Sequence, residues 1–204
     1  MNIFTHLGMA IKLKYFIESN CQIKLRTISF LMGSIKPDIS SQYKNIPHCK
    51  NGSEDFIQKE IQSLFLTKVY KSEKCTRVFS ERLGVLTHYF SDFFCYVHLD
   101  SYKGNMLEHY IYEMQQSVYY LKNPKTTSPC CYKEDIRSSH DTSSLCSYID
   151  ELYTEYLTVC NKLCHYFDIA FSIKACTALC FSIITECIAD EETLPSITEA
   201  EAFS

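Results

Sequence analysis

The sequence contains no tryptophan and only five glycines and five prolines in 204 residues. A β-sandwich or β-barrel needs a turn every few residues, and glycine and proline make most of those turns, so their scarcity argues against such folds. Apolar residues nevertheless make up 46% of the chain, which is enough to fill the core of one domain. We therefore predict an all-α fold, a single domain of about six or seven helices.

Positive charge is scarce as well. Lys and Arg number 20 against 24 Asp and Glu, which gives a net charge of −4, and the two signs are interspersed along the chain. A protein that binds nucleic acid usually carries a basic patch or stripe. We therefore do not expect nucleic acid as a partner.

The N-terminus lacks the pattern of a signal peptide, because no basic segment leads into an apolar one and both His6 and Lys12 interrupt the apolar residues. The most apolar segment, residues 170–189, contains Lys174, Glu186 and several hydroxyl side chains. That composition argues against a membrane-spanning helix and for a buried C-terminal helix. We therefore expect a cytoplasmic protein.

Cysteine, in contrast, is abundant, with twelve residues. In a reducing compartment these thiols are expected to stay free and to pack in the core as small apolar side chains. The pairs Cys160/Cys164 and Cys176/Cys180 each share a helix face and could instead bind a thiophilic metal. Core packing is the interpretation that we favour.

Apolar residues at helical spacing predict the individual helices. The expected helices span residues 6–18, 21–35, 53–70, 74–97 and 106–121, with two more within 145–190. Thr5 is the predicted N-cap of the first helix, and Ser53 is predicted to start the third. The helical domain covers residues 1–190, with a long mobile loop or lid at 123–144, and an acidic tail follows at 191–204.

One stretch, residues 84–113, carries most of the functional information. It contains His88 and Asp92 as an HxxxD pair, His109 and Glu113 as an HxxxE pair, and His98 between the two pairs. Residues four apart on a helix lie on one face, where an imidazole and a carboxylate can bind the same metal ion. Three of the seven histidines thus fall at metal-ligand spacing, and zinc suits such nitrogen and oxygen ligands.

Three further residues extend this set. Asp38 and His48 each follow a proline in the loop between the second and third helices, where a stiffened backbone can aim a ligand into a cleft. His6 lies on the first turn of the first helix. Taken singly, each has an ordinary explanation, such as a hydrogen-bonded structural histidine or a local side-chain pair. Together they favour a polynuclear metal cleft between helices, because burying so many polar groups unpaired would be costly.

The order of these residues resembles that of the zinc-dependent phospholipase C family. The shared order is a His, a loop Asp after Pro, a His, then G-x-x-x-H-Y-x-x-D, a His ten residues after the first of these, and H-x-x-x-E. The resemblance covers residues 6–113 and implies an all-α fold that encloses three zinc ions, a fold that the single-strand-specific zinc nucleases share. By this resemblance the first zinc ion is held by Asp38, His48, His88 and Asp92. The second is held by His98, His109 and Glu113, and the third by Asp92, as a bridge, together with His6.

Two departures from the family pattern affect these expectations. In the secreted enzymes the mature chain begins with a Trp whose amino group and carbonyl complete the third site, whereas this sequence has no Trp and Met1 lies five residues before His6. We therefore expect two zinc ions, with the third site lacking that ligand. The residues before His98 are apolar and aromatic, and on a straight helix His98 would rise roughly 9 Å beyond Asp92. A helix end near residue 97 would bring it closer.

The expected function is that of a zinc-dependent phosphodiester hydrolase of the phospholipase C type. A metal-activated water would attack the phosphoryl group of a phospholipid or another phosphodiester, and a lipid substrate would bring peripheral contact with a membrane. Asp38 is the candidate catalytic residue, either as a metal ligand or as the base that orients the water. Two alternatives stay open, a single-strand nuclease of the same fold and a metal-binding protein without phosphodiesterase activity. His140 and His165 receive no role.

Overall fold

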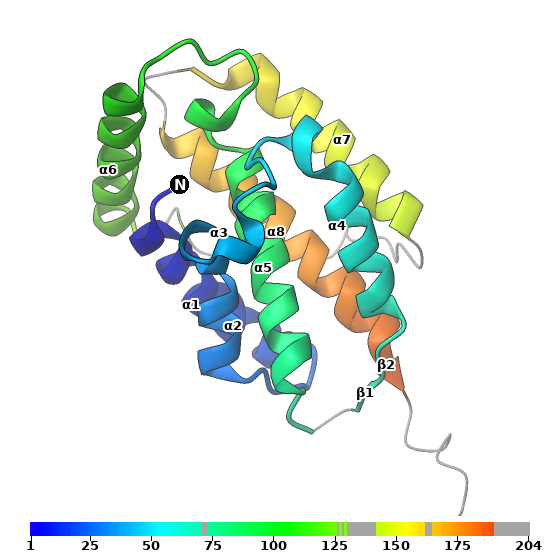
Figure 1. The fold of residues 1–204 in the computed structure, drawn as a ribbon. Helices are drawn as coiled ribbons and strands as arrows, with labels where there is room; N and C mark the ends of the chain where they lie inside the picture. The colour runs from blue at the N-terminus through cyan, green and yellow to red at the C-terminus, as the bar shows by residue number, and fades with distance from the viewer. Residues whose placement is uncertain (71–72, 126, 128, 130–141, 162–164, 190–204) are drawn as a thin grey trace, which may run out of the picture.

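The computed structural model describes residues 1–70, 73–125, 127, 129, 142–161 and 165–189. Within them lie eight α-helices, two short 3-10 helices (η1 and η2) and one pair of two-residue strands (Figure 1). In chain order these elements are α1 (Ile3–Asn20), α2 (Thr27–Gly33), α3 (Lys36–Ile39), η1 (Ser41–Tyr43), α4 (Lys50–Phe65), β1 (Val69–Tyr70), α5 (Arg77–Phe93), η2 (Tyr96–His98), α6 (Met106–Lys122), α7 (Thr142–Val159), α8 (His165–Cys187) and β2 (Ile188–Ala189). The predicted all-α fold is confirmed.

Helix α5 runs through the centre of the fold, with α2, α4 and α8 packed around it. Every residue from Leu83 to Phe93 is buried. Figure 1 shows α4 and α7 on one side of α5, α1 and α2 on the other, and α6 at the outer edge of the molecule. Because α5 is enclosed on all sides, the polar side chains in its C-terminal half must find their partners inside the protein.

Helices α2 and α5 pack with their backbones in close contact, and two glycines make this contact possible. A Cβ atom on Gly84 would lie 2.3 Å from the Phe30 carbonyl oxygen, and one on Gly33 would lie 2.1 Å from the Glu81 carbonyl oxygen. Neither backbone could give way without moving a whole helix. Gly84 is the glycine that precedes His88 by four residues, so this contact sets how closely α2 and the chain after it approach the metal-ligand face of α5.

Helix α8 fills the back of the core. It is the one helix in the described part of the chain that is long and apolar enough to cross a membrane, and 72% of its most apolar stretch is buried inside the protein. The nine described cysteines are free thiols. Cys176 and Cys180 of α8 are fully buried in the core, as predicted.

Several predicted helix starts are wrong. Helix α2 begins at Thr27, six residues after the predicted start at residue 21, and α5 begins at Arg77 instead of residue 74. The N-cap of α1 is Asn2, whose side chain accepts a hydrogen bond from the Thr5 N–H at 3.1 Å, so Thr5 is already inside the helix. Helix α4 starts at Lys50, three residues before the predicted start at Ser53. The Ser53 hydroxyl is buried and donates back to the Cys49 carbonyl at 2.9 Å, as interior helical serines do.

Several predicted helix ends also differ. Helix α4 stops at Phe65, and residues 69–70 instead form β1, which pairs in parallel with β2. Helix α5 stops at Phe93, four residues before the predicted end. The loop expected after α2 holds the short helices α3 and η1. Most of the predicted loop at 123–144, together with His140, Cys164 and the tail at 191–204, lies outside the described residues.

Asp168, in the first turn of α8, joins four separate elements through its buried carboxylate. It accepts hydrogen bonds from the Tyr112 hydroxyl at 2.7 Å and the Gln116 amide at 2.8 Å, both on α6. It also accepts from the Tyr156 hydroxyl of α7 at 2.7 Å and from the Tyr96 backbone N–H of η2 at 3.2 Å. These bonds fix α6 and η2 against the core helix α8. The two elements carry His109, Glu113 and His98, the three residues predicted to hold the second metal ion.

Replacing Gly84 by alanine is expected to lower the free energy of unfolding by about 1–3 kcal/mol, because the added methyl group would meet the backbone of α2. Gly8→Ala is the matched control, since a Cβ atom there would meet only the ring of Tyr120, a side chain that can shift. Chemical denaturation of both variants measures the difference. Equal stabilities for the two variants would show that α2 and α5 do not need this close contact.

The pH dependence of stability tests the buried state of Asp168. Burial raises the pKa of this carboxyl to about 6, even though its tyrosine hydroxyl and backbone N–H donors favour the charged form, and the pKa of an unfolded Asp is about 4. The folded protein therefore keeps a proton that the unfolded chain releases, and this stabilisation is complete below about pH 4 and lost as the pH rises through about 6. Asp168→Asn has no such proton.

We accordingly expect the free energy of unfolding of the wild-type protein, relative to that of Asp168→Asn, to fall by about 3 kcal/mol between about pH 4 and pH 7. Urea denaturation of both proteins across that range, at matched metal loading, gives this difference. A difference independent of pH would contradict the raised pKa.

Candidate metal centre

A cleft of about 450 Å³ opens between the start of α1, α3, and α6, with η2 at its inner end. All eight predicted ligands meet at this cleft or just beneath its floor, where their donor atoms form overlapping groups of three, each within 4.8 Å. The groups are His6, His88 and Asp92; Asp38, His48 and His88; His48, Asp92 and His98; and His98, His109 and Glu113. The structure thus brings together residues that lie more than a hundred positions apart in the sequence.

The first cluster surrounds the Nε2 atom of His88. This atom lies 3.2 Å from Asp92 Oδ2, 3.6 Å from Asp38 Oδ1 and 3.2 Å from His48 Nδ1. His48 Nδ1 is in turn 2.9 Å from Asp92 Oδ2 and 3.7 Å from Asp38 Oδ1. Four ligands at about 2.0–2.1 Å around a tetrahedral zinc ion lie roughly 3.3 Å from one another. The five distances given, between 2.9 and 3.7 Å, lie around that value.

The second cluster is built by η2 and α6. The Nε2 atoms of His98 and His109 each lie 3.0 Å from Glu113 Oε1. His98 Nδ1 also lies 3.6 Å from Asp92 Oδ2, which links this cluster to the first. The early end of α5 explains the geometry: the chain leaves the helix after Phe93 and turns back through η2. His98 therefore reaches the cleft instead of rising along a continued helix.

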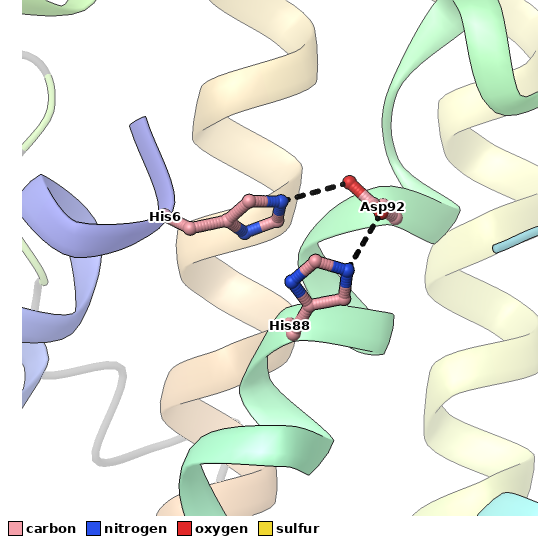
Figure 2. A group of neighbouring side chains, drawn as sticks. All are labelled: His6, His88 and Asp92. Carbon is pink, nitrogen blue, oxygen red and sulfur yellow. Dashed lines mark ion pairs between the residues drawn. The ribbon is translucent and has the colours of Figure 1, made fainter. Parts of the chain in front are cut away.

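The third group lies on the other side of Asp92. Figure 2 shows His6, from α1, and His88, from α5, pointing at the Asp92 carboxylate from two directions. His6 Nε2 is 3.3 Å from Asp92 Oδ1. The amino group of Met1 is 2.5 Å from the same oxygen and 3.1 Å from both Glu113 Oε1 and His98 Nε2. An amino group therefore lies beside the third group. We had not expected one there, because the sequence lacks the tryptophan that supplies this group in the secreted enzymes.

Hydrogen bonds outside the cleft orient two of these histidines. His88 Nδ1–H donates to the Ser34 carbonyl at 2.9 Å. The Ser91 hydroxyl donates to the His88 carbonyl at 2.8 Å, so it is left to accept from His6 Nδ1–H at 3.0 Å. Both rings therefore carry their proton on Nδ1 and turn the Nε2 lone pair toward Asp92, as second-shell partners of metal-binding histidines do.

One buried atom supports the fit of these residues to a metal ion. His6 Nε2 is buried and has no hydrogen-bond partner in the described structure. With Nδ1 already protonated, Nε2 is an acceptor that faces the acceptor Oδ1 of Asp92 across 3.3 Å. Two hydrogen-bond acceptors this close repel each other unless a cation binds between or beside them. Zinc binds nitrogen and carboxylate ligands such as these.

The charges inside the cleft agree with this interpretation. Although burial alone would raise it, the electrostatic interactions with the His98 ring and with the Met1 amino group hold the pKa of the Asp92 carboxyl well below its usual range. Hydrogen bonds from His109 and His98 likewise lower the pKa of Glu113 against the effect of burial. Burial lowers the pKa of His6 to about 3 and also lowers that of His98. Ionised carboxylates and neutral imidazoles are the forms that bind metals.

The sequence did not indicate several residues that support the centre. Ser34 and Ser91 orient histidines only through contacts made by the folded chain, and no pattern marks them. Asp168 could have been noticed as the acidic residue in the first turn of the largely apolar helix 165–187. His165 is half-buried with its ring 4.5 Å from that of Tyr112, and it belongs to none of the donor groups.

Comparison with known proteins agrees with this geometry. A family model described as zinc dependent phospholipase C matches residues 5–163, which is most of the chain and includes all eight candidate ligands. No curated protein and no solved structure matches the chain. The chain therefore belongs to the zinc-dependent phospholipase C family.

Proposed function

We propose that this protein hydrolyses a phosphodiester, with a phospholipid as the substrate, by zinc-dependent chemistry. The observation that carries the proposal is the convergence of eight nitrogen and carboxylate donors on one cleft, in overlapping groups of three whose ligand atoms lie within 4.8 Å of one another. The family membership of the chain supports the same reaction class.

Two sets of residues would hold the metal ions. Asp38, His48, His88 and Asp92 form one set, and His98, His109 and Glu113 form the other, with Asp92 Oδ2 near both. His6, Asp92 Oδ1 and the Met1 amino group form a third set, which shares Asp92 with the first. Two ions are the number that we propose. Bound there, zinc would supply Lewis acidity, which neutralises charge on a phosphoryl group and acidifies water.

Asp38 is the residue that we assign to proton transfer. Asp92 is fully buried, whereas the Asp38 side chain is 24% exposed and lines the cleft, where a water and a substrate could both reach it. Burial raises the pKa of the Asp38 carboxyl, which makes it a stronger base than an ordinary surface aspartate. Its place on the short helix α3, behind Pro37, keeps the carboxylate aimed into the cleft.

The mouth of the cleft favours a lipid over a nucleic acid strand. Ile3, Phe4, Tyr110 and Met114 line it, and no Lys or Arg is among the described residues that do so. A groove for single strands combines stacking aromatics with basic side chains that follow the phosphates. An apolar rim beside a charged floor suits a substrate with a polar headgroup and apolar chains.

Zinc content tests the two proposed sites. We expect about two zinc ions per wild-type chain, and fewer in both His88→Ala and His109→Ala, because each variant removes a nitrogen donor from one cluster. His165→Ala serves as the control, since that histidine lies in none of the clusters. Plasma mass spectrometry on purified, untagged protein gives the numbers. One zinc ion or none in the wild-type protein would contradict the proposal and favour a degenerate site.

Asp38→Asn tests the proposed base. The amide keeps the shape and one ligand oxygen but cannot take a proton, so we expect hydrolysis of bis(p-nitrophenyl) phosphate to fall by about 10²–10⁴-fold while zinc content stays unchanged. Asp55→Asn, an exposed aspartate on α4, is the matched control and should keep full activity. Wild-type rates in a zinc-loaded Asp38→Asn protein would remove Asp38 from the mechanism.

A further inference from the structure

The outer face of α6 is apolar. Five side chains at intervals of four and three residues form a stripe along it, and Met106 and Tyr110 lie beside the stripe. The stripe comprises Leu107, Ile111, Met114, Val118 and Leu121, with exposed fractions between 38% and 75%. We call this surface the α6 stripe. It extends roughly 21 Å, at a rise of about 1.5 Å per residue, along the outermost helix in Figure 1.

Folding alone does not account for the α6 stripe. The opposite face of α6 already packs against the protein through Tyr112, Gln116 and Tyr120, which are buried. The only exposed polar side chains within α6 are Glu108, Gln115 and Lys122. A contiguous apolar surface of this kind usually marks a binding site.

The α6 stripe continues into the metal cleft. Met114 of the stripe and its neighbour Tyr110 line that cleft together with His98 and His109. Phe4 of α1, which is 73% exposed, lines the cleft from the other side. A body lying against the α6 stripe would therefore also lie across the mouth of the cleft.

The charges around the α6 stripe are mostly positive, although the chain as a whole has a net charge of −4. Lys103 precedes α6, and Lys122 and Lys125 lie at and just beyond its end, all three exposed. Glu108 is the one exposed acidic side chain on this helix. An apolar helix face with lysines at its margins is the pattern of a helix that lies on an anionic membrane surface.

We propose that the α6 stripe and Phe4 dock on a lipid bilayer that contains anionic lipid and hold the mouth of the metal cleft against it. This inference rests on the proposed lipid substrate and names the surface that delivers it. The four-three spacing also suits packing against a helix of a second copy, but the stripe covers only two heptads, and self-association through such a seam usually needs three or four. Lipid is therefore the occupant to which we commit.

A triple variant tests the docking surface. Leu107→Gln, Val118→Gln and Leu121→Gln remove three apolar side chains of the stripe, none of which lines the cleft. We expect the affinity for vesicles of phosphatidylcholine and phosphatidylglycerol, measured by co-flotation, to fall at least about tenfold. Hydrolysis of soluble bis(p-nitrophenyl) phosphate should stay unchanged, because the donor groups are intact.

The matched control carries Ile28→Gln, Leu66→Gln and Val78→Gln, three apolar residues outside α6 with exposed fractions of 65–85%, and should bind vesicles like the wild-type protein. If the stripe variant does not fold, Lys122→Glu with Lys125→Glu takes its place. That charge reversal is expected to weaken binding to the anionic vesicles and to remove its dependence on salt.

Three outcomes would overturn the inference. In the first, the wild-type protein binds neither pure phosphatidylcholine vesicles nor mixed vesicles. In the second, the stripe variant and its control bind vesicles equally. In the third, sedimentation analysis shows a wild-type dimer that the stripe variant does not form. The last outcome would identify a second copy as the occupant.

The same measurements separate this inference from the proposed function. Vesicle binding through the stripe without hydrolysis of any phosphodiester would refute the proposed function alone, and hydrolysis without stripe-dependent binding would refute this inference alone.

Discussion

The Asp92 carboxylate is the group on which the rest of the structure depends. It is completely buried, its oxygens lie near four imidazoles and the Met1 amino group, and each of those partners comes from a different part of the chain or a different turn. An ionised carboxylate without partners would cost several kcal/mol to bury. The start of α1, the loop before α4, and η2 must therefore all close on the same point of α5. The fold and the site are stabilised by the same contacts.

Two features outside the cleft make that convergence possible. Gly33 and Gly84 let α2 touch the backbone of α5, which carries the Ser34 carbonyl to His88 and brings α3, with Asp38, over the cleft. On the far side, Asp168 collects hydrogen bonds from η2, α6 and α7. It thereby holds His98 and Glu113 at their distance from Asp92. A glycine contact positions one cluster, and a buried carboxylate positions the other.

The centre is enclosed on the protein side and open toward an apolar rim. Its floor combines carboxylates, of which Asp92 has a pKa well below its usual range, with imidazoles, and burial lowers the pKa of two of these, His6 and His98. Such nitrogen and carboxylate donors could hold a metal ion. The rim, with Phe4, Tyr110 and Met114, leads directly to the exposed face of α6. A charged floor beneath an apolar entrance fits a molecule whose polar and apolar parts are joined, and a phospholipid is such a molecule.

The helical class followed from the sequence alone, since glycine and proline are too few for a turn-rich fold, and the motifs indicated the candidate donors that the fold brings together. His88 with Asp92 and His109 with Glu113 are local pairs whose spacing on a helix fixes their common face. Helix ends were harder to predict: Asn2 rather than Thr5 caps α1, and α5 stops at Phe93, four residues before its predicted end. The order of motifs indicated which residues belong to one centre, but not their distances.

Only the tertiary structure decided what depends on contacts between distant segments. The Met1 amino group beside Asp92, the tautomers that Ser34 and Ser91 impose, and the four elements joined by Asp168 have no local signal, because each arises from residues that pack together far from one another in the chain. The exposed stripe on α6 is similar. Its apolar spacing predicted a helix, but which face of that helix the core would cover was settled by Tyr112 and Gln116 reaching Asp168.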